Sequence, residues 1–317
     1  MNLEKPYLIM MVGLSGSGKT KKAYELATQY NAKVLSSDEF RKNICGDIKD
    51  QTQNNKVFEL LHEKIFEHLK NQESVIYDAT NISLKYRTLF FKSMKEHDIA
   101  FCDIITCAYV MTSSVQNCQK QDYLRDDIIE NNIIKKQLYK FEIPFFEEGF
   151  DYIWLEGYND NNEKKHKCKL YNRMSIMNTM NSNVDDKINI FNHGKITKKY
   201  IKSEINQDYI LEAALFHDIG KIYSSSIHKN IFYPEAYHAQ IGTYMLLQNL
   251  DILQLNNYTD ILKTLCIINY HTKAEYWDID EKTRNKNISI FGIELYNILM
   301  IFNKANQKSK EKGGEQE

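Results

Sequence analysis

The chain has 317 residues with 43% hydrophobic and 26% charged residues, a composition that excludes a disordered protein and, at this length, favours two domains. No apolar run reaches the roughly 20 residues that cross a bilayer, so a membrane-spanning protein is not expected. The formal net charge of −1 argues against a protein that grips long nucleic acid through a basic surface; a nucleic-acid substrate would be held only by its end.

The first half of the chain alternates apolar runs with amphipathic helical patterns. The runs predicted to form strands lie at 7–14, 33–36, 74–77, 100–108 and 151–156. Helical patterns separate them at 20–30, 57–69 and 85–96. This alternation predicts an α/β domain, a parallel sheet with flanking crossover helices, at residues 1–158.

The composition changes after residue 158. Residues 159–184 are polar and poor in periodic apolar positions, which predicts a linker. From residue 185 onward only helical patterns occur, among them 196–205, 209–217, 237–247 and 259–270. We predict an all-α domain at 185–305 and a flexible, charged tail at 306–317.

Residues 13–20 fit the phosphate-binding pattern G-x-x-x-x-G-K-[ST] and lie between a predicted strand and a predicted helix. The backbone N–H groups of such a loop bind phosphate oxygens, Lys19 reaches the β- and γ-phosphates, and Thr20 holds Mg²⁺. The pattern therefore predicts binding of ATP or another nucleoside triphosphate with Mg²⁺. The residues expected to bind it are Gly13, Ser15, Gly16, Ser17, Gly18, Lys19 and Thr20.

Two further polar segments follow predicted strands. Asp38 would lie at the same edge of the sheet as the phosphate loop, where it could accept a proton from an attacking hydroxyl or serve as a helix N-cap. Arg41, one helical turn later, could pair with an acceptor phosphate. Asp78 ends the third strand and could orient Mg²⁺ or the acceptor, while Asn81 could contact substrate or cap the next helix.

These three segments, S-S-D-E-F-R at 36–41 and D-A-T-N at 78–81 together with the phosphate loop, resemble the polynucleotide-kinase-like branch of P-loop kinases over residues 7–155. The resemblance implies that Asp38 is the general base for a 5′-hydroxyl, that Arg41 contacts the acceptor phosphate and that Asp78 positions the acceptor. The family also has a lid with paired arginines. Here that stretch keeps only Lys120 and Arg125 as cations before an F-E-x-P-like segment at 141–144.

The second half of the chain carries a pattern of histidines around an adjacent His-Asp pair. His217 and Asp218 end an apolar helical pattern, and three further histidines lie on separate predicted elements: His193, His238 and His271. Imidazole and carboxylate ligands suit Mn²⁺, Fe²⁺, Co²⁺, Ni²⁺ or Zn²⁺. The remaining histidines, at 62, 68, 97, 166 and 228, are interpreted as surface or packing residues.

This pattern resembles the HD phosphohydrolase superfamily over residues 185–305. The resemblance implies that all four histidines and Asp218 bind one or two divalent metals, with Asp218 bridging a pair, and that Lys221 meets substrate phosphate. The family closes its site with a late aspartate. Asn303 stands at that position, where its amide oxygen can still bind metal but brings no charge; Asp278 and Asp280 are less favoured replacements.

Together the two resemblances imply a bifunctional end-healing enzyme. The first domain would phosphorylate the 5′-hydroxyl ends of RNA or DNA, and the second would remove a 3′-phosphate or open a 2′,3′-cyclic phosphate. Two other hypotheses stay open: a kinase for nucleosides or small metabolites joined to a nucleotide hydrolase, and a nucleotide-sensing protein with an impaired metal site. Six scattered cysteines without a C-x-x-C pair favour a cytoplasmic protein, and the sequence leaves a homodimer open.

Overall fold

The computed structural model describes residues 5–123, 131–158, 176–177, 179–180, 190–224 and 235–313. The chain divides into two compact units, Met1–Tyr158 and Asn159–Glu317, and each is described by itself. Most of the predicted linker at 159–184 lies outside the described residues.

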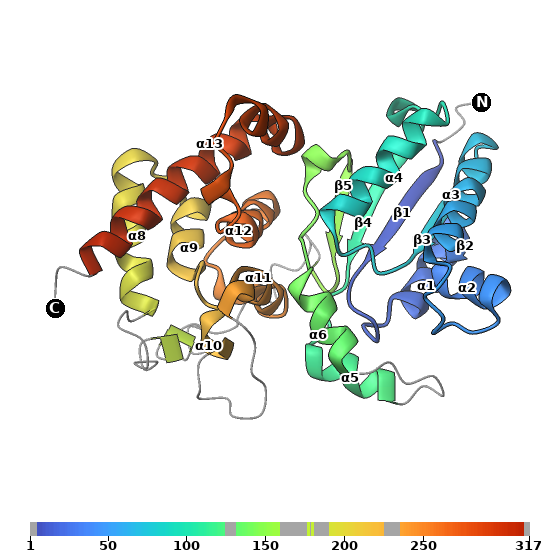
Figure 1. The fold of residues 1–317 in the computed structure, drawn as a ribbon, viewed down its shortest axis with the longest axis horizontal. Helices are drawn as coiled ribbons and strands as arrows, with labels where there is room; N and C mark the ends of the chain where they lie inside the picture. The colour runs from blue at the N-terminus through green and yellow to red at the C-terminus, as the bar shows by residue number, and fades with distance from the viewer. Residues whose placement is uncertain are drawn as a thin grey trace. The chain divides into compact units, whose positions relative to one another are not determined.

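The N-terminal unit is built on a parallel sheet of five strands in the order β2-β3-β1-β4-β5 (Figure 1). All four pairings between neighbouring strands are parallel, as the alternating sequence pattern predicts. The strands are β1 (Tyr7–Val12), β2 (Lys33–Ser36), β3 (Val75–Asp78), β4 (Ile105–Val110) and β5 (Tyr152–Leu155).

Helices connect and cover these strands. They are α1 (Lys19–Tyr30), α2 (Ser37–Cys45), α3 (Asn54–Lys70), α4 (Leu84–Glu96), α5 (Val115–Tyr123) and α6 (Asn131–Tyr139). One predicted strand is corrected: residues 100–104 of the expected strand 100–108 do not join the sheet, because Phe101–Asp103 form a 3₁₀ turn and β4 begins only at Ile105.

The centre of the sheet is buried on both faces. Ile9 and Met11 of β1, Ile76 of β3 and Cys107 of β4 belong to one core cluster beneath α1. Helices on both faces explain why these strands read as continuous apolar runs instead of alternating ones. Because the strands are parallel, the carboxyl ends of β1, β2 and β3 meet at one edge, where the chain turns from apolar to polar residues.

The second unit contains only helices among its described residues, which confirms the predicted all-α region. They are α8 (Ile190–Glu204), α9 (Asp208–Phe216), α10 (Lys221–Ser224), α11 (His238–Leu247), α12 (Tyr258–Tyr270) and α13 (Glu281–Gly313). Gly194 lets α8 and α9 approach closely, since a Cβ at this position would lie 2.6 Å from the carbonyl oxygen of Leu215.

Helix α13 corrects the prediction of a flexible tail from residue 306. The helix continues to Gly313, with a break in helical geometry only at Gly292, whose φ is 72°. Asn306 and Ser309 are 3% and 1% exposed and contact His193 of α8. Charged residues dominate the composition of this stretch, so its periodic buried face was not recognised in the sequence. That face packs the helix against α8.

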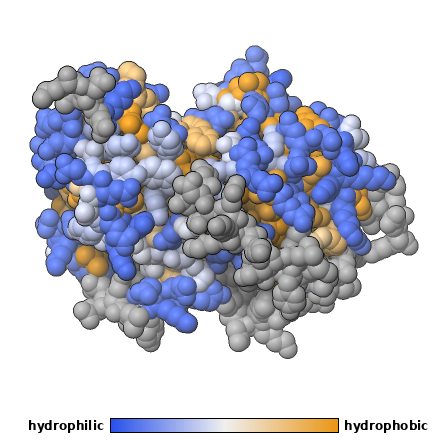
Figure 2. Space-filling view, turned by 180° about the vertical axis from the view of Figure 1, so that it is seen from behind, coloured by the Kyte–Doolittle hydropathy of each residue, from blue (hydrophilic) through white to orange (hydrophobic). Residues whose placement is uncertain are grey.

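By length and composition alone, the segment Glu281–Glu311 could cross a membrane, and 44% of its most apolar 18-residue window is buried within the unit. On the face shown in Figure 2, hydrophilic residues cover most of the described surface, with smaller apolar areas between them.

Candidate functional sites

The phosphate loop connects β1 to α1 and depends on two glycines in the left-handed region. Gly16 and Gly18 have φ values of 74° and 92°. A Cβ at Gly16 would lie 2.2 Å from the carbonyl oxygen of Cys118 in α5, so this position has no space for a side chain. The loop is therefore held in a curled shape by residue choice and by contact with α5.

Lys19 and Thr20 open α1 at the inner side of the loop. Lys19 is buried, and its Nζ donates to the carbonyl oxygen of Leu14 at 2.8 Å. Thr20 Oγ1 donates to Asp78 Oδ2 at 2.8 Å, which joins the loop to the end of β3. Burial raises the pKa of Asp78, and the nearby Lys19 and Thr20 oppose this shift. A threonine hydroxyl beside a carboxylate is an oxygen-rich place that suits Mg²⁺.

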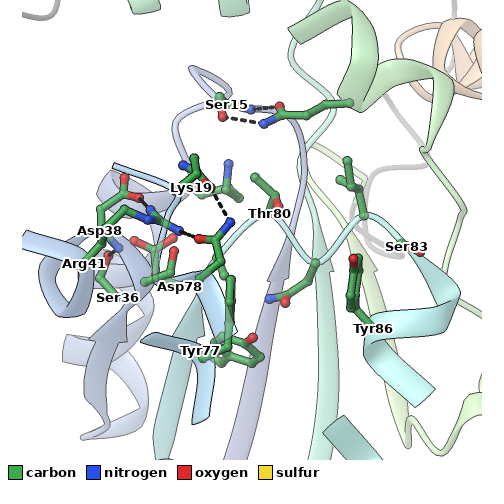
Figure 3. Close-up of a pocket in the computed structure, with 18 of the residues that line it drawn as sticks. Ser15, Lys19, Ser36, Asp38, Arg41, Tyr77, Asp78, Thr80, Ser83 and Tyr86 are labelled. Atoms are coloured by element: carbon green, nitrogen blue, oxygen red, sulfur yellow. Dashed lines mark hydrogen bonds and ion pairs between the residues drawn. The ribbon is translucent and has the colours of Figure 1, made fainter. Parts of the chain in front are cut away.

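Asp38 and Arg41 lie on α2 beside this edge (Figure 3). Ser36, not Asp38, is the N-cap of α2, which leaves the half-exposed Asp38 carboxylate free of a capping role. Arg41 Nη1 donates to Asp38 Oδ1 at 3.1 Å, and its Nη2 donates to Asn54 Oδ1 at 3.0 Å. Arg41 Nε is buried and has no hydrogen-bond partner among the described residues, and Arg41 lines the cavity described below.

Asn81 has a role that differs from the capping expectation. Its backbone is left-handed, with φ 45°, and its Nδ2 donates to the carbonyl oxygen of Met11 at 2.9 Å, which ties the β3–α4 turn to β1. The first backbone N–H of α4, that of Leu84, donates instead to Glu142 Oε2 at 2.7 Å. The F-E-x-P-like segment therefore holds the start of α4.

Several of the residues described above line one cavity of about 1060 Å³. Its lining includes all the described residues predicted to act on the acceptor or on the triphosphate γ-position: Lys19, Thr20, Asp38, Arg41, Asp78 and Asn81. Ser15, Gly16 and Gly18 line it as well, whereas Gly13 and Ser17 do not. In Figure 3, Asp38 and Arg41 lie on one side of the pocket, and Ser83 and Tyr86 lie on the other.

Helix α6 contributes residues that the sequence analysis missed. Gln137 Oε1 accepts from the backbone N–H of Ser15 at 2.8 Å, and its Nε2 donates to Ser15 Oγ at 2.9 Å. Lys136 of the same helix and Lys140, directly after it, also line the cavity. Lys120 is exposed on α5 and is not among the lining residues, and Arg125 lies outside the described residues. Among the described residues, Lys136 and Lys140 are therefore the lysines that could take the role expected of the lid.

A buried ion pair fixes the wall formed by α4. Arg87 donates through Nε and Nη2 to the two carboxylate oxygens of Glu148, at 2.6 and 2.8 Å, and both side chains are buried. Arg87 Nη1 also donates to the carbonyl oxygens of Asn81 and Glu142 at 2.9 Å. Burial raises the pKa of Glu148, and Arg87 opposes this shift.

In the helical unit, all four predicted histidines converge on Asp218. The distances from its carboxylate oxygens are 3.0 Å to His238 Nε2, 3.5 Å to His217 Nε2, and 3.7 Å to Nε2 of both His193 and His271. All five side chains are buried. Two overlapping groups could each hold a metal ion, one formed with His193 and His217 and the other with His238 and His271.

Two of the imidazoles have a defined tautomer. Nδ1 of His217 contacts the carbonyl oxygen of Ala214 at 2.9 Å, and Nδ1 of His271 contacts that of Ile268 at 2.8 Å. A carbonyl oxygen only accepts, so Nδ1 of each neutral ring carries the hydrogen and Nε2 presents a lone pair. Backbone carbonyls commonly orient metal-binding histidines in this way. His271 Nε2 also lies 3.2 Å from His238 Nε2.

Burial lowers the pKa of His193, His217 and His271 and so favours their neutral imidazoles. Burial lowers the pKa of His217 well below its usual value, although Asp218 opposes this shift. Burial by itself would raise the pKa of Asp218, but His217 and the hydrogen bond from His238 outweigh it and hold that pKa well below the usual range. An ionised carboxylate among neutral imidazoles is the protonation state that a metal ion requires.

Orphaned polar atoms support a metal at this centre. Asn303 Oδ1 and His217 Nε2 are buried and have no hydrogen-bond partner among the described residues. Such atoms are costly unless a partner satisfies them, and a divalent cation would satisfy the lone pair of His217 Nε2 beside Asp218. The residues present therefore fit a metal. Lys221 Nζ lies 3.0 Å from Asp218 Oδ2 at the border of the site.

The sequence analysis missed two residues that contact both ring nitrogens of His193, so His193 has to release one of these contacts to bind a metal. Asn306 Oδ1 lies 2.8 Å from His193 Nε2, and Ser309 Oγ lies 3.1 Å from its Nδ1. Asn306 and Ser309 lie three and six residues after Asn303 on α13, and this spacing could have indicated both residues. Asp278 and Asp280, the less favoured replacements for the late aspartate, instead interact with Tyr296 and Thr283 near the start of α13.

Comparison with known families agrees with this division. Residues 8–144 match a family model described as an AAA domain, and residues 184–296 match one described as an HD domain. No curated protein matches the chain. The chain thus joins a P-loop kinase-like domain, matched by the AAA model, to an HD domain, a combination that fits a fused kinase and phosphohydrolase.

Proposed function

We propose that the chain is a cytoplasmic bifunctional end-healing enzyme that phosphorylates the 5′-hydroxyl ends of RNA or DNA and removes a 3′-phosphate or opens a 2′,3′-cyclic phosphate. The observation that carries the proposal is the cavity that places Asp38 and Arg41 beside Lys19 of the phosphate loop, in the same chain as an Asp218 centre suited to metal. The two sites would act on the two ends of one break.

In the kinase reaction, Asp38 accepts the proton of the attacking 5′-hydroxyl, and the Arg41 guanidinium pairs with the acceptor phosphate. Lys19 exchanges its contact with Leu14 for the β- and γ-phosphates of the triphosphate. Thr20 and Asp78 would hold Mg²⁺, which neutralises charge on the transferred group. Lys136 and Lys140 add positive charge to the same cavity.

In the phosphohydrolase reaction, His193, His217, Asp218, His238 and His271 would hold one or two divalent metals, with Asn303 as an uncharged ligand. Such a metal lowers the pKa of bound water and polarises the phosphorus centre. Lys221 contacts the substrate phosphate from the border of the site. Backbone carbonyls keep His217 and His271 in the tautomer that binds metal.

The test is an end-group assay on oligonucleotides with defined termini. Purified protein with ATP and Mg²⁺ should phosphorylate 5′-hydroxyl ends. Asp38→Ala should reduce the rate at least about 100-fold, as expected for a lost general base, and Lys19→Ala should reduce it at least as far because it removes the cation that binds the β- and γ-phosphates. Lys22→Ala, on α1 but outside the cavity lining, is the matched control and should retain the rate. Phosphorylation of free nucleosides or metabolites with no transfer to oligonucleotides would reject the proposal.

A further inference from the structure

One end of the cavity is a groove between α3 and α4. Its floor is His62 and Tyr77, and its walls are Phe58 of α3 with Tyr86 and Leu89 of α4; we call these five residues the aromatic groove. His62 Nε2 lies 2.9 Å from the hydroxyl of Tyr77. The His62 ring also packs against Phe90 of α4, with centroids 4.9 Å apart, so the two helices meet beneath the groove.

The aromatic groove is uncharged. Burial lowers the pKa of His62 to about 4, which keeps its imidazole neutral at physiological pH. Among the described residues of α3 and α4 that line the cavity, none is Lys or Arg, and Glu59 is the one carboxylate. A phosphate is disfavoured here, whereas a neutral planar group with hydrogen-bonding edges fits.

The walls leave large apolar surfaces open to the cavity. Tyr86 is 66% exposed and Leu89 is 49% exposed, although both line the same cavity as the phosphate loop. Figure 3 shows Tyr86 across the pocket from Asp38 and Arg41. Bases stack on exposed aromatic side chains of this kind, at about 1–3 kcal/mol for each base.

We propose that the aromatic groove binds the 5′-terminal nucleobase of the acceptor strand, an inference that rests on the proposed kinase function. The aromatic groove, Asp78 and Asp38 line the same cavity, so a base held in the groove leaves its sugar in the pocket that contains the residues proposed to act on the hydroxyl. Tyr86 and Phe58 stack on or flank the base, and the His62–Tyr77 pair offers polar atoms to its edge. The groove thus recognises a nucleoside end.

The experiment compares two oligonucleotides that share the same 5′-hydroxyl and the same sequence, one with an ordinary 5′-terminal nucleoside and one with a 5′-terminal abasic tetrahydrofuran residue. Wild-type protein should have about tenfold higher kcat/KM for the ordinary end, since about 1.4 kcal/mol corresponds to a factor of ten. Tyr86→Ala should abolish this preference by raising KM for the ordinary end alone, and Tyr86→Phe should restore it. Tyr152→Ala removes a similarly exposed tyrosine of β5, which is outside the cavity lining, and should keep the preference.

The outcomes separate this proposal from the kinase proposal. Equal kcat/KM for the two ends in wild-type protein, or equal losses for both ends in Tyr86→Ala, would overturn the groove assignment while the kinase function stands. Absence of phosphate transfer to either oligonucleotide would overturn both. A preference that depends on Tyr86 and not on Tyr152 supports the groove.

Discussion

At the candidate metal centre, the carboxylate of Asp218 lies within 3.0–3.7 Å of four imidazoles, and we propose the amide of Asn303 as the closing ligand. An amide oxygen binds a metal as a dipole, whereas a carboxylate binds it as a full negative charge. The centre therefore has less negative charge than its ligand number suggests, and the charge of one residue should set its metal affinity.

Asn303→Asp should tighten binding of Mn²⁺ or Zn²⁺ about tenfold or more, because it adds a charge beside the ion in a buried site. Titration calorimetry or competition with a chelator measures the affinity without any assay of catalysis. Asn287→Asp places the same charge elsewhere on α13, and its metal affinity should equal that of wild type. Unchanged affinity in Asn303→Asp would show that this side chain does not face the ion.

His62 should make the N-terminal unit sensitive to acid. Its folded-state pKa of about 4 lies below its usual value of 6.5, so the unfolded chain binds more protons between these values and stability is lost as the pH falls through this window. The loss at pH 5 should be about 2 kcal/mol relative to pH 7.5. Urea unfolding at both pH values measures it, and His62→Gln should show a smaller loss. An equal loss in the variant would exclude His62 as its origin.

Sequence reasoning reached the residues whose chemistry is written in local patterns. The phosphate loop, Asp38 and the histidines around Asp218 each lie in a segment with its own spacing. The phosphate loop and Asp38 line one cavity, and the histidines surround Asp218. Gln137 had no such signal, because its partner Ser15 is 122 residues away and a glutamine on an amphipathic helix is unremarkable in sequence. Contacts between distant segments depend on how elements pack, which spacing alone does not encode.

At the scale of elements, helix α4 is held by the buried ion pair between its Arg87 and Glu148, which lies 61 residues later in the chain. Removing one partner of a buried pair leaves an uncompensated charge. Arg87→Ala should therefore lower the free energy of unfolding by about 3–5 kcal/mol. Lys92→Ala breaks an exposed pair on the same helix and should change stability by less than about 1 kcal/mol. Thermal and urea unfolding test both variants, and equal effects would refute the assignment.

Element boundaries were harder to predict than element types. The helical unit and the parallel sheet followed from periodicity, but residues 100–104 were too apolar to separate from β4 by pattern. The end of α13 was predicted to be a flexible tail because its charged residues dominate the composition. Packing of Asn306 and Ser309 against His193 stabilises a helix that composition alone would leave frayed.

At the scale of the whole molecule, each site draws its described residues from one unit only. Lys19→Ala should therefore abolish triphosphate binding without changing metal content, and Asp218→Asn should lower metal content without changing triphosphate binding. Elemental analysis and a fluorescent-nucleotide titration on the full chain measure the two properties. A variant that loses both would indicate that the sites are coupled.

The Gln137–Ser15 contact means that the phosphate loop already has an occupant before any nucleotide arrives. A phosphate oxygen that binds the Ser15 amide has to displace the Gln137 carbonyl, so entry is an exchange of acceptors. For the proposed nucleotide, that exchange of acceptors costs net affinity in both the triphosphate and the diphosphate state.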